Sequence, residues 1–176
     1  MLFGSSAILV NAVSRVLTDA GCDVTPLDEL LGRTANADLL VAHGGRRRLV
    51  EVKRESGNAA ESLVYDAHRH LDTWPQLRPD IQVEGATLIV NHQTNTRPLI
   101  RSAAVYSRPE FVQSLTIPVI ATLELFDAWR SGDFDAIRNA VFPPAARHRP
   151  VSEATPARES APPPTGRARR RRRWRG

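Results

Sequence analysis

Residues 38–53 read DLLVAHGGRRRLVEVK, and this stretch decides the expected fold. Two short apolar runs flank a pair of glycines, a pattern that predicts two strands joined by a turn. Side chains of a strand alternate between the two faces of a sheet, so Glu51 and Lys53 are expected to point the same way. The turn would bring Asp38 beside them. The stretch therefore predicts two carboxylates and an ammonium group at one end of a sheet.

Such a group of side chains is suited to Mg²⁺ and a phosphodiester. Mg²⁺ prefers oxygen ligands, which Asp38 and Glu51 would supply as carboxylates and Val52 as a backbone carbonyl. A phosphate bound there would be polarised, and a bound water would become more acidic. Lys53 would orient that water or stabilise the developing negative charge. The alternative interpretation is an amphipathic strand whose acidic and basic residues lie on its solvated face and have no chemical role.

The spacing also resembles a known motif. Asp38, twelve intervening residues and then Glu51-Val52-Lys53 are similar to the D…E-x-K signature of the PD-(D/E)xK superfamily, the restriction-endonuclease-like nucleases. The resemblance implies an α/β fold with an αβββαβ core, in which helices flank a mixed central sheet. It also implies a Mg²⁺-dependent (or Mn²⁺-dependent) nuclease that hydrolyses DNA phosphodiester bonds, with Asp38, Glu51 and Lys53 as catalytic residues. A homodimer is a further expectation, because many related folds pair to cut two strands.

One feature departs from the active members of that superfamily, many of which carry a metal-binding glutamate on the first helix. Here the first acidic residue is Asp19, at the end of the expected helix, and Asn11 stands where such a glutamate would be expected. A second hypothesis is therefore a catalytically inactive module of the same fold that binds or regulates within a nucleic-acid defence or repair system. A third is an interaction protein whose basic C-terminal segment does all of the binding.

Hydrophobic periodicity and turn residues predict the other elements. Helices are expected at residues 5–20, 58–74, 111–115, 123–130 and 133–142, with a helical turn at 27–31, and strands at 23–25, 39–41, 49–52, 86–91 and 117–122. Asn58 should cap the second helix and Pro75 should end it. Its apolar face would consist of Leu63, Val64, Ala67, Leu71 and Trp74. The resemblance places this helix beside the active site, where Tyr65 or His68 could contact substrate; a solvated polar face is the alternative.

Positive charge is concentrated after residue 142. Residues 1–142 contain 14 Lys/Arg and 17 Asp/Glu, a net charge of −3, whereas residues 143–176 contain 10 and 2, a net charge of +8. The second segment is rich in Pro, Ala and Arg and has few residues that could form a core. We therefore expect one folded domain, 1–142, and a disordered basic tail, 143–176. Its predicted nucleic-acid-binding residues are Arg169, Arg170, Arg171, Arg172, Arg173 and Trp174.

The arginines of this tail would attract nucleic acid, with DNA as the expected partner, by releasing counterions, and an indole can stack on an unpaired base. Anionic lipid or an acidic protein would attract the same residues. A second basic run, Arg46, Arg47 and Arg48, lies at the expected hairpin, where it could steer phosphate toward Glu51 and Lys53. A solvated hairpin tip explains that run equally well.

Composition also narrows the classes of protein to which the chain could belong. The chain has 176 residues, enough for one domain with a core, and its single cysteine, Cys22, allows neither an internal disulfide nor a cysteine-based metal cage. We expect Cys22 to be a small buried residue. No stretch approaches the roughly 20 apolar residues of a membrane span, and the N-terminus is a poor signal peptide. A cytoplasmic protein without a membrane span is therefore expected.

Overall fold

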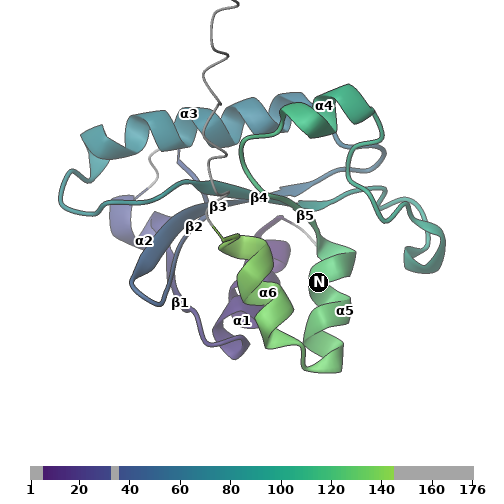
Figure 1. The fold of residues 1–176 in the computed structure, drawn as a ribbon, viewed down its shortest axis with the longest axis horizontal. Helices are drawn as coiled ribbons and strands as arrows, with labels where there is room; N and C mark the ends of the chain where they lie inside the picture. The colour runs from purple at the N-terminus through teal and green to yellow at the C-terminus, as the bar shows by residue number, and fades with distance from the viewer. Residues whose placement is uncertain (1–5, 33–35, 145–176) are drawn as a thin grey trace, which may run out of the picture. The chain divides into compact units, whose positions relative to one another are not determined.

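A computed structural model describes residues 6–32 and 36–144, in which a five-stranded sheet carries helices on both faces (Figure 1). The elements in chain order are α1 (Ser6–Asp19), β1 (Asp23–Pro26), α2 (Leu27–Leu31), β2 (Leu39–His43), β3 (Arg46–Arg54), α3 (Ser62–Leu77), β4 (Ala86–Asn91), the 3₁₀ helix η1 (Pro98–Ile100), α4 (Pro109–Ser114), β5 (Val119–Ala121), α5 (Thr122–Ser131) and α6 (Phe134–Val141). The expected α/β class, with a mixed sheet flanked by helices, is confirmed. Residues 145–176, which hold most of the expected basic tail, lie outside the described residues.

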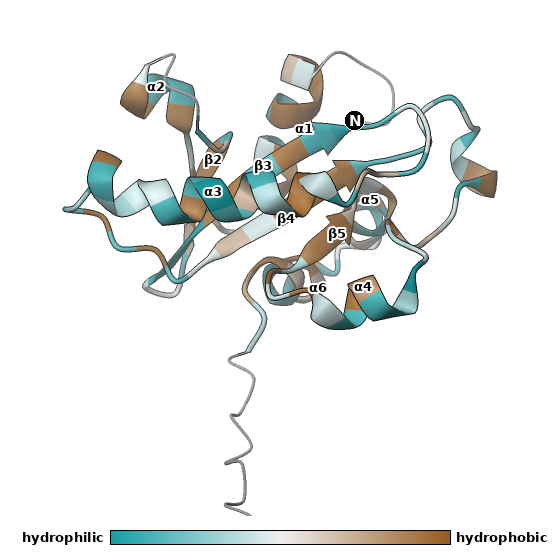
Figure 2. Cartoon of the chain, turned by 90° about the horizontal axis from the view of Figure 1, so that it is seen from above, coloured by the Kyte–Doolittle hydropathy of each residue, from teal (hydrophilic) through white to brown (hydrophobic). Residues whose placement is uncertain are grey.

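The strands lie side by side in the order in which they occur in the chain. β1, β2 and β3 pair antiparallel, whereas β3, β4 and β5 pair parallel. A parallel pair needs a crossover connection, which α3 provides between β3 and β4, and η1 with α4 between β4 and β5. All residues of β4 are buried, as expected for a central strand covered on both faces. In Figure 2, β4 and β5 are largely hydrophobic, whereas α3 alternates between hydrophobic and hydrophilic residues.

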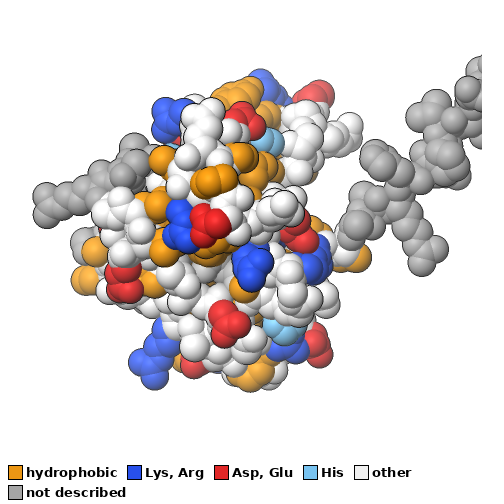
Figure 3. Space-filling model, turned by 90° about the vertical axis from the view of Figure 1, so that its left-hand side faces the viewer, with side chains coloured by type: hydrophobic (Ala, Val, Ile, Leu, Met, Phe, Trp, Pro, Cys, Tyr) orange, Lys and Arg blue, Asp and Glu red, His pale blue; other side chains and the backbone are white. Residues whose placement is uncertain are grey.

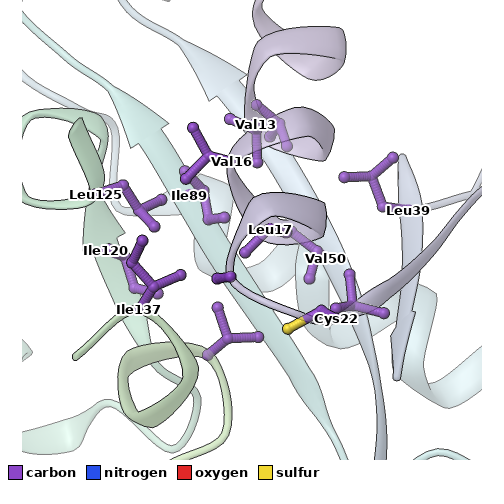
Figure 4. Close-up of a cluster of buried hydrophobic side chains, with 14 of the residues drawn as sticks. Val13, Val16, Leu17, Cys22, Leu39, Val50, Ile89, Ile120, Leu125 and Ile137 are labelled. Carbon is purple, nitrogen blue, oxygen red and sulfur yellow. The ribbon is translucent and has the colours of Figure 1, made fainter. Parts of the chain in front are cut away.

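Two apolar cores lie on opposite faces of the sheet. The first joins the sheet to α1, α5 and α6 and includes Val13, Leu17, Cys22, Leu39, Val50, Ile89 and Ile137 (Figure 4). The second lies under α3 and α4 and includes Leu40, Leu49, Leu63, Ala67, Trp74, Leu88 and Val90. Cys22 is 4 % exposed, so its predicted burial is confirmed.

The division between the two cores decides where the polar side chains of β2 and β3 point. Leu39 and Val50 face the first core, and their sequence neighbours Leu40 and Leu49 face the second. Because strand side chains alternate, Glu51 belongs to the same face as Leu49, which is the face that α3 covers. The predicted site therefore lies against α3, on the far side of the sheet from α1.

The β2–β3 hairpin is longer than the sequence predicts. β3 begins at Arg46 instead of residue 49, and Arg46 pairs with His43 across the turn. Gly44 and Gly45 both have positive φ, of 57° and 80°, a combination that glycine adopts readily in a two-residue hairpin turn. Two of the added strand residues, Arg46 and Arg48, form ion pairs with Glu84, which lies two residues before β4.

Three groups form what we call the Glu84 clasp: Glu84 itself and the guanidinium groups of Arg46 and Arg48. Arg46 donates to both carboxylate oxygens of Glu84, at 2.7 and 2.6 Å, and to the carbonyls of Phe142 and Pro143, at 3.0 and 2.8 Å. Arg48 reaches the same carboxylate at 3.2 Å and is only 7 % exposed. The clasp therefore fastens the end of the described chain to the hairpin.

The structure also corrects both ends of α3. The helix begins at Ser62 and not at Asn58, whose side chain accepts a hydrogen bond from Gln93 Nε2 at 2.9 Å and does not cap the helix. It continues through Pro75 to Leu77. Proline removes one helical hydrogen bond, but the neighbouring Trp74 is buried and donates from Nε1 to the Ile81 carbonyl at 2.6 Å, which holds the last turn in place.

Among the described residues, no helix combines the length and the apolar character needed to cross a membrane.

Candidate functional site

The structure brings Asp38, Glu51 and Lys53 together on the α3 face. Asp38 immediately precedes β2, and its backbone N–H donates to the Val50 carbonyl at 3.1 Å. The next pair in the ladder is Leu39 with Val50, so Asp38 comes beside Glu51 at the open end of β2. Two residues further along β3, Lys53 points to the same face as Glu51. The predicted convergence of the three side chains is therefore observed.

Glu51 and Lys53 form a direct ion pair. The Lys53 Nζ lies 2.5 Å from Glu51 Oε1. The two groups differ in exposure, since the Glu51 side chain is 3 % exposed and that of Lys53 is 34 % exposed. Burial lowers the pKa of Lys53, but the hydrogen bond and charge of Glu51 raise it more, so the net shift is upward. The ammonium group is thus held charged at the edge of a buried carboxylate.

Asp38 is fixed by the backbone of the neighbouring strand. Its Oδ2 accepts a hydrogen bond from the Val52 N–H at 2.7 Å. Burial raises the pKa of Asp38 to about 6, although the Val52 hydrogen bond opposes the shift, and the charge of Glu51 raises the pKa further. The carboxylate is therefore held in one orientation and in surroundings that disfavour its charge.

The Val52 carbonyl is directed toward the same space. Leu49 and Glu55 donate their N–H groups to the carbonyls of Gly85 and Asn91, on the β4 side of β3. Alternation along a strand then directs the N–H and carbonyl of Val52 to the opposite side, where Asp38 lies. The backbone oxygen predicted as a metal ligand is thus on the side of the strand that holds the aspartate.

His70 is a member of this site that the sequence analysis missed. It is 6 % exposed on α3, and its Nε2 lies 3.8 Å from Glu51 Oε2. Burial lowers the pKa of His70, and the positive charges of Arg69 and Lys53 lower it further, which favours the neutral imidazole. A signal was present in the sequence, because position 70 follows Ala67 by three residues and precedes Trp74 by four, on the apolar stripe of the helix.

One oxygen of the site has no partner. Glu51 Oε2 is buried and accepts no hydrogen bond. Burial raises the pKa of Glu51, while the hydrogen bond and the charge of Lys53 lower it. A buried carboxylate oxygen left unsatisfied costs free energy, and its usual explanation at a functional site is a ligand or ion.

These donors fit a hard divalent cation. Mg²⁺ is commonly held by one or two carboxylates together with substrate phosphate and water, and the site offers Asp38, the unpartnered oxygen of Glu51 and the Val52 carbonyl. Within the described ranges, no three His, Cys, Asp or Glu side chains stand close enough together to hold a metal by themselves. The protein side of such a site would therefore be incomplete without substrate or water oxygens.

The steering of phosphate by Arg46, Arg47 and Arg48 stays a prediction. The antiparallel register puts them at the hairpin end of β3, three to five residues from Glu51, or roughly 10–16 Å along the strand at about 3.3 Å per residue. Two of them are held in the Glu84 clasp, and Arg47 is exposed. Contact between these arginines and nucleic acid likewise stays a prediction.

The other residues singled out in the sequence lie in different parts of the chain. Tyr65 is 67 % exposed on α3, one helical turn and a half before His70, and stays a candidate for substrate contact. His68 points elsewhere, with its Nε2 3.0 Å from Thr116 Oγ1. Asn11 is exposed on α1, across the sheet from the site. The predicted tail residues, namely Arg169, Arg170, Arg171, Arg172, Arg173 and Trp174, lie outside the described residues.

No protein-family model, no curated protein and no solved structure matches this chain. The interpretation of the site therefore depends on its own chemistry. A cavity of about 600 Å³ lies elsewhere and is lined by residues of η1 and α5, such as Leu99, Leu123 and Phe126. On the face shown in Figure 3, acidic and basic side chains are interspersed and neither forms a broad patch.

Lys53 has one further property that the sequence analysis missed. The chain contains 24 Lys and Arg residues, and Lys53 is the only lysine among them. Arginine thus serves at every other basic position. A lysine side chain differs by its compact, strongly hydrated ammonium group, which acts as a point charge where a guanidinium would spread it over a plane.

Proposed function

We propose that this protein is a metal-dependent nuclease of the PD-(D/E)xK, restriction-endonuclease-like class, which hydrolyses DNA phosphodiester bonds. The observation that carries the proposal is the convergence of Asp38, Glu51 and the only lysine of the chain on one face of the sheet. The order of elements from α1 to β4, with α2 as an insertion, is compatible with an αβββαβ core.

Each side chain has a defined part in this proposal. Asp38 and Glu51, with the Val52 carbonyl, would hold Mg²⁺ or Mn²⁺, and the bound cation would polarise the phosphate and lower the pKa of a bound water. Lys53 is a third exposed, so its ammonium group can reach a substrate that the buried Glu51 cannot. From there it would hold the attacking water or stabilise the negative charge that develops on the phosphate.

The test is DNA cleavage by the full chain with Mg²⁺ or Mn²⁺, on plasmid, linear, branched and single-stranded substrates. Glu51→Gln and Lys53→Met should each lower the cleavage rate by roughly 100-fold or more, the size of effect seen when one transition-state contact is removed. Glu55→Gln is the matched control, because Glu55 follows the same strand and the described structure gives its side chain no role in the site. Cleavage that survives Glu51→Gln or Lys53→Met would reject the assignment.

A catalytically inactive module of the same fold is the second candidate. Two observations favour it: Glu51 is already neutralised by Lys53 at 2.5 Å, and no group of three ligating side chains occurs in the described part of the chain. An NMR experiment on the single lysine can distinguish the two candidates. Reductive methylation with ¹³C labels only Lys53 and the N-terminal amine, so the resonance of Lys53 can be followed by itself.

A nuclease predicts that Mg²⁺ shifts the ¹³C resonance of Lys53 in the wild-type chain and leaves it unmoved in Asp38→Asn. The inactive module predicts no Mg²⁺-dependent shift in either protein. The same samples then report whether DNA binds without being cut, which is the behaviour expected of a binding or regulatory module.

A further inference from the structure

The connection between β4 and α4 exposes two large apolar side chains to solvent. Leu99 is 98 % exposed and Ile100 is 74 % exposed, and both belong to η1. In Figure 1 this connection extends outward from the sheet. Single exposed aliphatic residues are ordinary on protein surfaces, but an apolar patch of several residues usually marks a contact with another molecule. These two residues belong to such a patch, because further apolar surface lies beside them.

That further surface is the cavity of about 600 Å³ between η1 and α5. Pro98, Leu99 and Ala103 line it from the connection, and Leu123 and Phe126 line it from α5. A projecting apolar side chain and an apolar hollow thus lie next to each other on one molecule. Two copies related by a two-fold axis could each place the projecting residue in the hollow of the other, which is the arrangement of an isologous dimer.

Hydrogen bonds at the base of the connection tie this projecting segment to the end of β4. Arg101 is buried and donates from Nε to the Thr96 carbonyl at 2.8 Å and from Nη1 to Asn91 Oδ1 at 3.0 Å. The next residue, Ser102, donates its N–H to Gln93 Oε1 at 2.8 Å. Because both sides of η1 are fastened in this way, the apolar tip is preorganised and little conformational freedom is lost when it binds.

Charged side chains around the cavity favour a second copy of this chain as the partner. Arg97 precedes Pro98 and is exposed, and Glu124 lines the cavity from the first turn of α5 and is also exposed. Neither side chain forms an ion pair among the residues that the structure describes, whereas Asp127 and Arg130 pair with each other at 3.7 Å. A two-fold axis through the patch can bring Arg97 of each copy to Glu124 of the other, so the surface is complementary to itself in charge.

We infer that two copies of the chain form an isologous homodimer through this surface. We call it the η1 patch, and it consists of Leu99, Ile100, Leu123 and Phe126, with Arg97 and Glu124 at its edge. Nucleic acid suits the patch less well, because Glu124 and Asp127 repel phosphate. The inference is independent of the proposed nuclease, whose site lies on the face of the sheet that α3 covers.

Sedimentation of the full-length chain over a range of concentrations tests the dimer. We expect a dimer that dissociates on dilution, and a dissociation constant raised roughly 10-fold or more by Leu99→Asp, which places a charge in the apolar hollow. The substitution should leave folding intact because Leu99 is almost fully exposed, and circular dichroism checks this. Tyr65→Asp is the matched control, because Tyr65 is 67 % exposed on α3, outside the η1 patch, and should sediment like the wild type.

Two charge reversals test which residues meet across the axis. Arg97→Glu and Glu124→Arg should each weaken the dimer, because each reversal sets like charges opposite one another. An equimolar mixture of the two variants should dimerise again, because every contact between the two different chains then joins an acid to a base. This recovery cannot arise within a single chain, so it reports the intermolecular contact directly.

The results that would overturn the inference are distinct. A wild-type chain that stays monomeric throughout the concentration range overturns it, and so does a dimer that Leu99→Asp leaves intact. If the mixture of Arg97→Glu and Glu124→Arg forms no dimer, the two-fold arrangement is wrong. A loss of DNA affinity in Leu99→Asp without a change of mass would assign the η1 patch to nucleic acid instead.

Discussion

Asp38 and Glu51 are held where folding disfavours their charged forms. Burial raises the pKa of both carboxyl groups, to about 6 for Asp38, and only part of the effect is offset by the Val52 N–H and by Lys53. Residues whose charge opposes folding are typical of functional sites, because the surroundings are built for a ligand and not for stability. The two carboxylates should therefore cost stability in the free protein.

We expect Asp38→Asn to raise the free energy of unfolding at neutral pH by about 1–2 kcal/mol, a value discounted for partial exposure. The pKa of Asp38 is about 6 in the folded chain and near 3.8 when unfolded, so the folded state favours the protonated form. The stability that protonation contributes is complete below about pH 4 and is lost as the pH rises through about 6. The asparagine, which cannot ionise, escapes that loss.

Thermal unfolding as a function of pH checks this expectation. The melting temperature of Asp38→Asn should exceed that of the wild type by a few degrees at neutral pH, and the two should approach each other below about pH 4. Asp72→Asn, on the exposed side of α3, serves as the control and should follow the wild type throughout. A variant less stable than the wild type at neutral pH would show that the Asp38 charge is not opposed to folding.

At the scale of the elements, Gly85 and the Glu84 clasp determine how β3 joins β4. A Cβ at Gly85 would lie 2.8 Å from the Arg48 guanidinium. An arginine usually moves aside, but this one is bound by the Ala86 carbonyl at 2.6 Å and by Thr87 Oγ1 at 3.0 Å. Moving this buried side chain would break these hydrogen bonds and cost the free energy of a less well satisfied buried charge.

Gly85→Ala should therefore lower the free energy of unfolding by about 1–3 kcal/mol, the usual effect of overpacking. Gly57→Ala is its control, because a Cβ there meets nothing within 4 Å, and it should leave stability within about 0.5 kcal/mol of the wild type. Denaturant titration measures both. Equal stabilities would mean that Arg48 relaxes freely and that the clasp is not rigid.

Local patterns predicted some elements closely. The strand at residues 86–91 is observed as Ala86–Asn91, because a short apolar run bounded by polar residues suits a buried strand and little else. The first helix was expected at 5–20 and is observed at Ser6–Asp19, where its apolar stripe agrees with helical periodicity. The convergence of Asp38 with Glu51 and Lys53 was likewise predictable, since a hairpin register follows from its turn.

The features that could not be predicted from the sequence depend on contacts between residues that lie far apart in the chain. The early start of β3 depends on Glu84, which lies 38 residues from Arg46 in the chain and can be assigned to it only when β4 is placed. The end of α3 depends on the contact of Trp74 with Ile81 beyond the helix. His70 was missed because a polar residue on an apolar stripe acquires meaning only when Glu51 is known to face it.

At the scale of the whole molecule, charge separates the described part from the residues that follow it. Residues 1–142 carry a net charge of −3 and residues 143–176 a net charge of +8. A net negative domain attracts DNA poorly, so we expect non-specific affinity to come from the C-terminal arginines. Catalysis and general affinity would then belong to different stretches of one chain.

A chain that ends at Pro144 should bind DNA more weakly and with a smaller salt dependence. The truncation removes ten arginines, and if the seven between residues 167 and 175 each contact a phosphate, the slope of log K against log salt should become less negative by roughly 6. Its melting temperature should match that of the full chain, because the clasp contacts of Phe142 and Pro143 remain. Filter binding at several salt concentrations measures the slope, and an unchanged slope would place the DNA contacts within residues 1–144.

The Glu84 clasp also has a practical consequence for handling the protein. Arg46 donates hydrogen bonds to the carbonyls of Phe142 and Pro143, so a group attached just after residue 144 would join the chain near the hairpin end of β3, five residues along that strand from Glu51. A fluorophore, a bead or a fused enzyme placed there would leave the approach to Lys53 unobstructed. Immobilisation through that position should therefore keep long polymeric substrates accessible, where attachment through α3 would block them.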